Sequence, residues 1–145
     1  MFPSQLTNKY EIENRIGKGG YGLIFKGKNK QNNMKVATKV LYYNEEMTPN
    51  EFEETVKNEI NIMKLLKNEH SIKLYDYLKD KNDYYLILEY CDNDLEKYVS
   101  EKKGLKIYEI EKILKQLNKI FKDLLKLNCI HRDLKPSNIL MKFKI

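Results

Sequence analysis

The segment HRDLKPSN, residues 131–138, carries three polar side chains of different chemistry close together. Asp133 can accept a proton from a hydroxyl group, Lys135 can neutralise a phosphoryl group during its transfer, and Asn138 offers a hard oxygen ligand for Mg²⁺. A polar surface loop is the simplest alternative for His-Arg-Asp taken alone. The segment therefore needs support from other segments that bind phosphate.

A glycine-rich segment near the N-terminus is a candidate phosphate-binding segment. Gly17, Gly19 and Gly22 in IGKGGYGLI match the pattern G-x-G-x-x-G, which is weak evidence when it stands alone. A dinucleotide-binding fold needs a helix that begins at the third glycine. The following residues LIFKGK alternate as a strand instead. The glycines thus predict a hairpin whose backbone N–H groups can approach phosphate oxygens.

A lysine and a glutamate form the third candidate element. On a helical wheel, Glu59 falls within the apolar stripe formed by Phe52, Val56 and Met63. An unpaired carboxylate in such a stripe would cost several kcal/mol, so a cation should meet it. Lys39, on a predicted strand, is the candidate partner. A different helix register would place Glu59 at the edge of the stripe.

Apolar periodicity predicts the elements that position these residues. Alternation predicts three strands within the first forty residues and two more in SIKLYDYL and DYYLILEY, which together make a five-stranded sheet. The capping box Thr48-Pro49-Asn50-Glu51 begins an amphipathic helix of about four turns. A short helix around 95–99 and a longer one from about Ile110 to Leu127 follow. We read two lobes joined by a short polar connection, with His70 as a structural residue that caps a turn before the fourth strand.

These motifs, in this order and spacing, resemble those of the eukaryotic protein kinases of serine/threonine type along essentially the whole chain. GKGGYGLI is similar to their glycine-rich loop, VATK to the lysine motif of the third strand, and HRDLKPSNIL to the catalytic loop. The resemblance implies an α+β, protein-kinase-like fold. A five-stranded N-lobe sheet with one regulatory helix would be followed by the first helices and catalytic loop of a helical C-lobe. One domain over 1–145 would comprise an N-lobe at 1–88, a hinge at 89–94 and a partial C-lobe at 95–145.

The resemblance also implies ATP and Mg²⁺ as cofactors. It implies catalytic roles for Asp133, Lys135, Lys39 and Glu59, and a metal-binding role for Asn138. Leu88 would be the gatekeeper beside a hinge that meets adenine. The residues expected around ATP are Ile16, Gly17, Lys18, Gly19, Gly20, Tyr21, Gly22, Ile24, Ala37, Lys39, Leu88, Glu89, Tyr90, Cys91, Asp94, Asn138 and Leu140.

The expected function is that of an ATP-binding serine/threonine protein kinase, which transfers the γ-phosphate to serine or threonine hydroxyls of a protein substrate. The sequence contains no Asp-Phe-Gly motif, whose aspartate would hold Mg²⁺, so we expect little or no activity from the 145-residue chain alone. The alternative is a catalytically dead, kinase-like module that binds a nucleotide or a partner. The apolar face of the long helix should need later helices or a partner to cover it.

Composition excludes few function classes. Lys and Arg outnumber Asp and Glu by 27 to 21, but the basic residues are scattered singly among acidic ones, so we expect no nucleic-acid partner. A basic nucleic-acid binder is the third hypothesis, and it would show salt-sensitive affinity for RNA or DNA. No apolar run could span a bilayer, and Cys91 and Cys129 match no metal-ligand spacing. We expect no membrane association and a cytoplasmic location, with the nucleus also possible.

Overall fold

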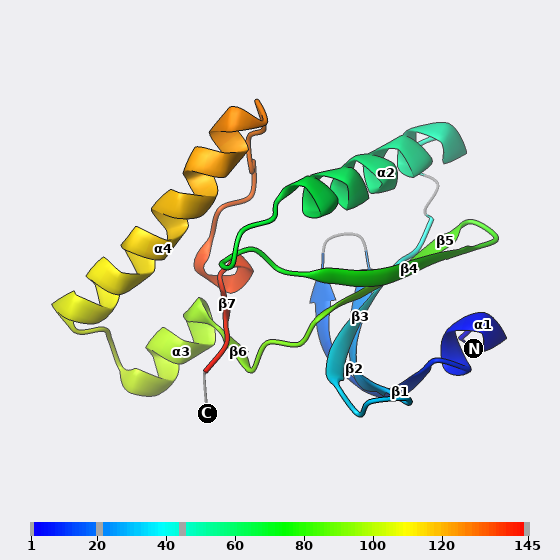
Figure 1. Cartoon of the computed structure of the whole chain (residues 1–145), viewed down its shortest axis with the longest axis horizontal. Coiled ribbons are helices and arrows are strands. Elements are labelled where there is room, and N and C mark those ends of the chain that lie inside the picture. The colour runs from blue at the N-terminus through cyan, green and yellow to red at the C-terminus, as the bar shows by residue number, and fades with distance from the viewer. Residues whose placement is uncertain (1, 20–21, 44–45, 144–145) are drawn as a thin grey trace. The chain divides into compact units, whose positions relative to one another are not determined.

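The computed structural model describes residues 2–19, 22–43 and 46–143. The chain divides into two compact units, one of residues 1–64 with 73–90 and the other of 65–72 with 91–145 (Figure 1). Residues 65–72 group with the second unit, although the sequence places them before the expected hinge. The lobe boundaries drawn from the sequence remain predictions.

The first unit contains the predicted five-stranded sheet. Its order is β1-β2-β3-β5-β4, and every neighbouring pair is antiparallel. Together with the helices, this sheet confirms the α+β fold class. The fourth strand begins three residues later than SIKLYDYL suggests, because Ser71 Oγ donates to the carbonyls of Leu66 and Asn68 in a turn. The strands are β1 (Tyr10–Gly19), β2 (Gly22–Asn29), β3 (Lys35–Leu41), β4 (Leu74–Asp80) and β5 (Asp83–Glu89).

Both faces of this sheet are covered by apolar side chains. On one face, Leu6 from the short helix α1 (Ser4–Thr7) joins a buried cluster with Tyr10, Val36, Val40, Tyr85 and Ile87. On the other face, helix α2 (Pro49–Leu65) buries Phe52, Val56 and Ile60. The central strands β3 and β5 are thus largely buried on both sides, in agreement with the continuous apolar run of β5 from Tyr84 to Leu88.

The N-terminus of α2 has the predicted capping box. Thr48 N donates to Glu51 Oε2 at 2.8 Å, and Glu51 N donates to Thr48 Oγ1 at 3.3 Å. Pro49 occupies the first helical position, where it needs no hydrogen-bond partner for its nitrogen. The side chain of Phe52 then packs edge-to-face on Tyr84 of β5, with ring centroids 6.2 Å apart. These contacts fix which face of α2 meets the sheet.

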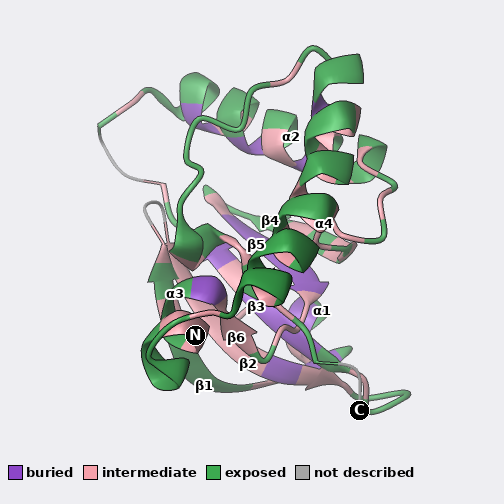
Figure 2. Cartoon of the chain, turned by 90° about the vertical axis from the view of Figure 1, so that its left-hand side faces the viewer, coloured by how far each residue is buried: buried purple, intermediate pink, exposed green. Residues whose placement is uncertain are grey.

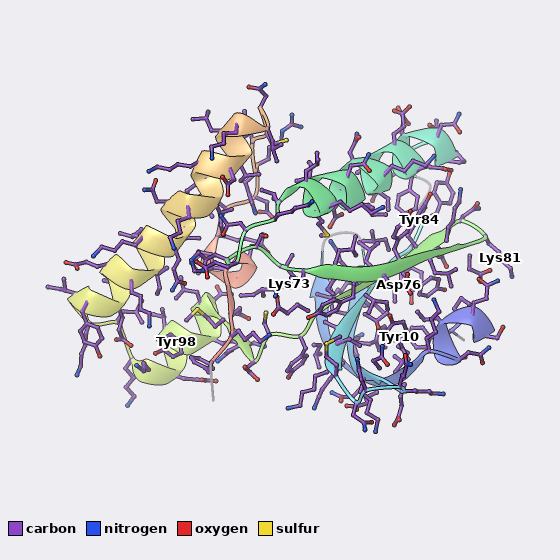
Figure 3. The ribbon with its side chains drawn as sticks, viewed as in Figure 1. Tyr10, Lys73, Asp76, Lys81, Tyr84 and Tyr98 are labelled. Atoms are coloured by element: carbon purple, nitrogen blue, oxygen red, sulfur yellow. The ribbon has the colours of Figure 1, made fainter. Side chains whose placement is uncertain are left out.

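The two edge strands of the sheet are tied to each other through side chains. Tyr10 on β1 donates its hydroxyl to Asp76 on β4, and Figure 3 labels both residues. Lys9 Nζ lies 3.2 Å from Asp76 Oδ2. Burial, and then the neighbouring carboxylate of Asp76, raise the pKa of the Tyr10 hydroxyl. The tyrosine therefore stays protonated and continues to donate at neutral pH.

Thr38 on β3 is a weak point of the core. Its side chain is fully buried, and no described residue lies within hydrogen-bond distance of Oγ1. A buried hydroxyl without a partner costs about 1–3 kcal/mol. We expect Thr38→Val to raise the free energy of unfolding by about 1 kcal/mol, measured by urea denaturation. Thr55→Val is the control, because Thr55 Oγ1 donates to Glu51 O at 2.8 Å and is exposed. Equal changes in the two variants, or a lower free energy of unfolding for Thr38→Val, would contradict the prediction.

The second unit is built around two helices. Helix α3 (Leu95–Lys102) is capped by Asp94, whose Oδ1 accepts from Lys97 N at 2.9 Å. Helix α4 (Ile107–Lys126) begins three residues before the predicted start, because Lys106 N donates to Glu109 Oε2 at 3.0 Å. Its end is set by Asn128, a non-glycine residue with a φ of 52° in the left-handed region. Cys129 N then donates to Leu124 O, the pattern of a Schellman motif.

The segment 65–72 is fastened to α4. Asn68 Nδ2 donates to Asp123 Oδ2 at 2.6 Å, and Lys119 Nζ lies 3.2 Å from Glu69 Oε1. Asn68 Oδ1 also accepts from the backbone N of His70 at 2.9 Å. The side chain that closes this turn is therefore that of Asn68, and the sequence-based assignment of this role to His70 was wrong.

A partly screened ion pair at the start of α4 should make the second unit sensitive to acid. The ammonium of Lys102 and then the backbone N–H of Lys106 hold the pKa of Glu109 at about 2. A folded-state pKa below the unfolded value stabilises the fold above about pH 4.3 and loses that contribution as the pH falls toward 2. We expect Glu109→Gln to lower the thermal midpoint at pH 7 and to flatten its decline between pH 5 and 2.

Lys102→Met tests whether the ammonium of Lys102 is the cause of the low pKa of Glu109. It removes the ammonium 2.6 Å from Glu109 Oε1 and leaves the carboxylate in place. Its thermal midpoint should therefore decline less steeply with acid than that of the unmodified chain. An unchanged slope in both variants would contradict the proposed linkage.

Candidate active site

The first unit places several predicted site residues in one row across the sheet. Cross-strand pairs join Gly17 to Ile24, Ile24 to Lys39, and Lys39 to Leu86. Residues that pair directly across antiparallel strands share one face of the sheet. Gly17 of the glycine-rich segment, the apolar Ile24 and the cation of Lys39 therefore lie on the face that α2 covers.

Lys39 and Glu59 are in contact, as the sequence predicted. Lys39 Nζ donates to Glu59 Oε1 at 2.7 Å across the gap between β3 and α2. Their side chains remain 23% and 32% exposed, so the carboxylate is half-buried and not enclosed as its place in the apolar stripe suggested. An ammonium has three donors, and this contact uses one of them. The other two can bind an anionic oxygen while Glu59 fixes the side chain.

Of the other residues predicted around ATP, Ala37 and Leu88 lie on the same face of the sheet as Lys39. Ala37 pairs with Leu88 across β3 and β5, and each is 8% exposed. Ile16 lies where the β1–β2 register shifts and is 39% exposed. Lys18 and Gly19 end β1. Glu89 ends β5, and its N donates to Lys73 O at 2.8 Å, with Tyr90 following half-buried. Gly20 and Tyr21 lie outside the described residues.

Gly22 has a steric reason for being glycine. A Cβ atom at this position would overlap the carbonyl group of Val40 on the neighbouring strand. The absence of a side chain therefore lets β2 approach β3 closely at the point where the glycine-rich hairpin returns to the sheet. The glycine pattern thus serves the packing of the hairpin as well as any approach to phosphate.

The second unit brings together the polar residues of HRDLKPSN. Lys135 Nζ lies 3.1 Å from Asp133 Oδ1, and Asn138 Nδ2 donates to Asp133 Oδ2 at 2.8 Å and to its carbonyl at 2.7 Å. The short 3₁₀ helix η1 (Pro136–Asn138) positions the asparagine. Arg132 adopts a φ of 64°, a conformation that non-glycine residues rarely take outside turns and functional sites. The segment forms a defined turn in which all three predicted side chains meet.

These contacts keep Asp133 ionised. Its hydrogen bond from Lys135, then that from Asn138, lower the pKa of the carboxyl group. The carboxylate is exposed, so a hydroxyl group can approach it. Asp133 can therefore accept a hydrogen bond from an incoming hydroxyl at neutral pH.

A two-stranded ladder holds this turn against the segment before α3. Strand β6 (Asn93–Asp94) pairs with β7 (Leu140–Met141), and Leu95 N donates to Ile139 O at 2.8 Å. Asp94, predicted as a ribose contact, has a second task as the cap of α3, which sequence reasoning missed. The acidic residue directly before a predicted helix was the available signal. Leu140 is 50% exposed, and Cys91 is half-buried.

The residues present fit a magnesium ion that is shared with a ligand. Both hydrogen bonds from Asn138 to Asp133 use the amide nitrogen, which leaves the amide oxygen for a cation. Within residues 2–19, 22–43 and 46–143, no group of three or more His, Cys, Asp or Glu side chains could hold a metal. Mg²⁺ is commonly bound through one or two protein oxygens plus substrate phosphates and water. Asn138 is suited to that mode and not to an all-protein metal site.

Two comparisons with known proteins bear on this geometry. Residues 10–145 match a family model described as the protein kinase domain. A serine/threonine protein kinase of Oryza sativa subsp. japonica is 32% identical over 142 residues, which cover 97% of this chain and 28% of that protein. The carbon catabolite-derepressing protein kinase of Candida glabrata is 27% identical over 135 residues, which cover 93% of this chain and 22% of that protein. The chain thus spans about a quarter of the length of these relatives. No helix in the described part of the chain is long and apolar enough to cross a bilayer.

Proposed function

Because the chain belongs to the protein kinase family, we propose that it forms the ATP-binding and catalytic-loop part of a serine/threonine protein kinase. The contact between Lys39 and Glu59 is the observation that carries this proposal. A lysine tethered by a carboxylate on the same sheet face as a glycine hairpin suits the phosphates of a nucleotide. The relatives named as serine/threonine protein kinases support the class of substrate.

The proposed roles follow from what each side chain offers. Lys39 donates to phosphate oxygens, and Glu59 orients it. Ala37 and Leu88 form part of the apolar surface for adenine, and the backbone N–H groups of the glycine hairpin meet the phosphates. The segment from Glu89 to Cys91 supplies hinge contacts. We propose ATP contacts for every residue that the sequence predicts around ATP, including Gly20 and Tyr21, which lie outside the described residues.

In the catalytic turn, Asp133 accepts the proton of a serine or threonine hydroxyl of the protein substrate. Lys135 lies beside Asp133 and neutralises the phosphoryl group during transfer. Asn138 would hold Mg²⁺, which neutralises charge on the phosphate oxygens when bound. We propose that the protein acts in the cytoplasm and that a partner or further helices cover the apolar face of α4, where Leu125 is 75% exposed.

A second function, nucleotide binding without turnover, concerns the 145-residue chain taken alone. Asn138 is the one residue of this sequence that matches a metal ligand of the family, and efficient transfer relies on a second one. The 145-residue chain alone is therefore expected to bind ATP and to transfer phosphate slowly or not at all.

Titration of the chain with Mg-ATP tests the proposal. Loss of one charge-assisted hydrogen bond, worth about 1.5–3 kcal/mol, should make Lys39→Met bind ATP about 10- to 100-fold more weakly. Lys35→Met is the matched control, because Lys35 is an exposed residue on the same strand and face. Absence of ATP affinity, or equal losses in the two variants, would contradict the proposal. Transfer of radiolabelled phosphate to a protein substrate separates the two functions.

A further inference from the structure

The lysines of α4 share one face of the helix. They are Lys112, Lys115, Lys119, Lys122 and Lys126, which we call the lysine stripe. Their spacing alternates between three and four residues, so they fall within an arc of about 80° and extend over about 21 Å. They lie opposite the apolar residues of α4, and the helix is mostly exposed in Figure 2. In the linear sequence the same lysines look scattered, because other residues separate them.

The charge of the lysine stripe is only partly neutralised. Lys115 lies 3.8 Å from Glu111, and Lys126 lies 3.1 Å from Asp123, but these two lysines are 79% and 76% exposed. In the described part of the chain, no acidic side chain forms an ion pair with Lys112 or Lys122. Like charges three or four residues apart on a helix repel. An anionic partner would relieve that repulsion along the whole stripe.

A recess lies beside the first three lysines of the stripe. Its volume is about 290 Å³, and its lining includes His70, Tyr108 and Gln116. His70 Nε2 lies 3.3 Å from Lys119 Nζ, and Tyr108 is 63% exposed. Glu111 also lines the recess, so the surface offers positive charge beside a shallow, open hollow with one carboxylate at its border.

We propose that the lysine stripe binds an acidic helical segment of a partner protein. Carboxylates at the same three- and four-residue spacing on a second helix would rise in the same steps of about 4.5 and 6 Å. A larger side chain of that helix would enter the recess. This proposal is independent of the nucleotide site.

The flanks of the lysine stripe favour a helix over a continuous polyanion. Glu111 and Asp123 border the stripe on opposite sides, and Glu69 contacts Lys119. A nucleic acid or an anionic membrane would place negative charge against these carboxylates as well as against the lysines. A partner helix can carry carboxylates along its centre and basic residues at its edges. Tyr108 is also the one aromatic residue within the arc of the stripe, so stacked bases would find little support.

Two synthetic helical peptides of identical composition test the proposal with the complete chain. In one peptide the glutamates repeat at the spacing of the lysine stripe, and in the other they are spread around the helix. Fluorescence anisotropy should show tighter binding of the first peptide. Lys112→Glu with Lys122→Glu should weaken that binding by about 10-fold or more. Lys30→Glu with Lys35→Glu makes the same change in net charge on the first unit and should leave binding intact.

Unfolding and non-specific attraction are distinguished within the same experiment. The thermal midpoint of the Lys112→Glu, Lys122→Glu variant should be unchanged or higher, because like-charge repulsion is reduced. Lysines placed at the facing positions of the peptide should restore its binding to this variant. Equal affinity for the two peptides would overturn the proposal. So would tighter binding of a single-stranded RNA or of phosphatidylserine vesicles, or the same loss in the control variant.

Discussion

Asp133→Asn is expected to lower the rate of phosphoryl transfer by about 10²- to 10⁴-fold, the usual contribution of a positioned proton acceptor. The asparagine keeps the shape of the side chain but cannot take the proton of the substrate hydroxyl. The backbone carbonyl of residue 133 still accepts from Asn138, a contact of 2.7 Å, so the turn should keep its conformation. The affinity for Mg-ATP should therefore change little.

The assay measures the transfer of radiolabel from ATP to a protein substrate. The enzyme in this assay is the longest protein that the gene encodes. Asp80→Asn is the matched control, because Asp80 is an exposed carboxylate at the end of β4. Equal rates for Asp133→Asn and the unmodified protein would show that Asp133 takes no part in the reaction. A parallel loss of ATP affinity would indicate a role in binding and not in proton transfer.

Ile87→Ala is expected to destabilise the first unit by about 2–5 kcal/mol. Ile87 is fully buried on β5 in the cluster with Val36, Val40 and Leu6, on the sheet face opposite α2. Truncation leaves a cavity that the rigid central strands cannot close. Since domains are commonly stable by about 5–15 kcal/mol, this single change could remove much of the total.

Urea denaturation followed by circular dichroism measures the loss. Leu65→Ala is the control, because Leu65 is 61% exposed at the end of α2 and its truncation should change the midpoint little. Similar shifts in the two variants would show that the cluster around Ile87 contributes less than its burial indicates. At temperatures well below the midpoint, ATP affinity of the Ile87→Ala variant should be retained, because Lys39 and Glu59 lie on the other face.

The sequence was sufficient to predict features that depend on local patterns. The capping box before Phe52 fixed the start and register of α2, and this register led to the contact between Lys39 and Glu59. The glycine hairpin and the five strands followed from alternation of apolar residues. The roles assigned to the site residues remain predictions, because contact between side chains does not establish what they bind.

Features set by distant contacts could not be predicted in this way. Asn68 is positioned by Asp123, a residue far along the chain, so its place in the turn had no local signal. The half-exposed state of Glu59 depends on how α2 lies on the sheet. The lysine stripe did have a signal, the three- and four-residue spacing. Net charge and a search for clusters along the linear sequence did not detect it, because other residues separate the lysines.

The small ladder between β6 and β7 has a consequence for local opening. It closes the loop between residues 94 and 140, and a flexible loop of that length costs about 3 kcal/mol in chain entropy. Two residue pairs cannot offset such a cost unless α3 and α4 are already in place. The turn formed by residues 131–138 inside this loop is thus a low-stability cooperative element, whereas β3 and β5 belong to the most protected part of the chain. Amide hydrogens of residues 131–138 should exchange with solvent through sub-global opening while those of the central strands are still retained.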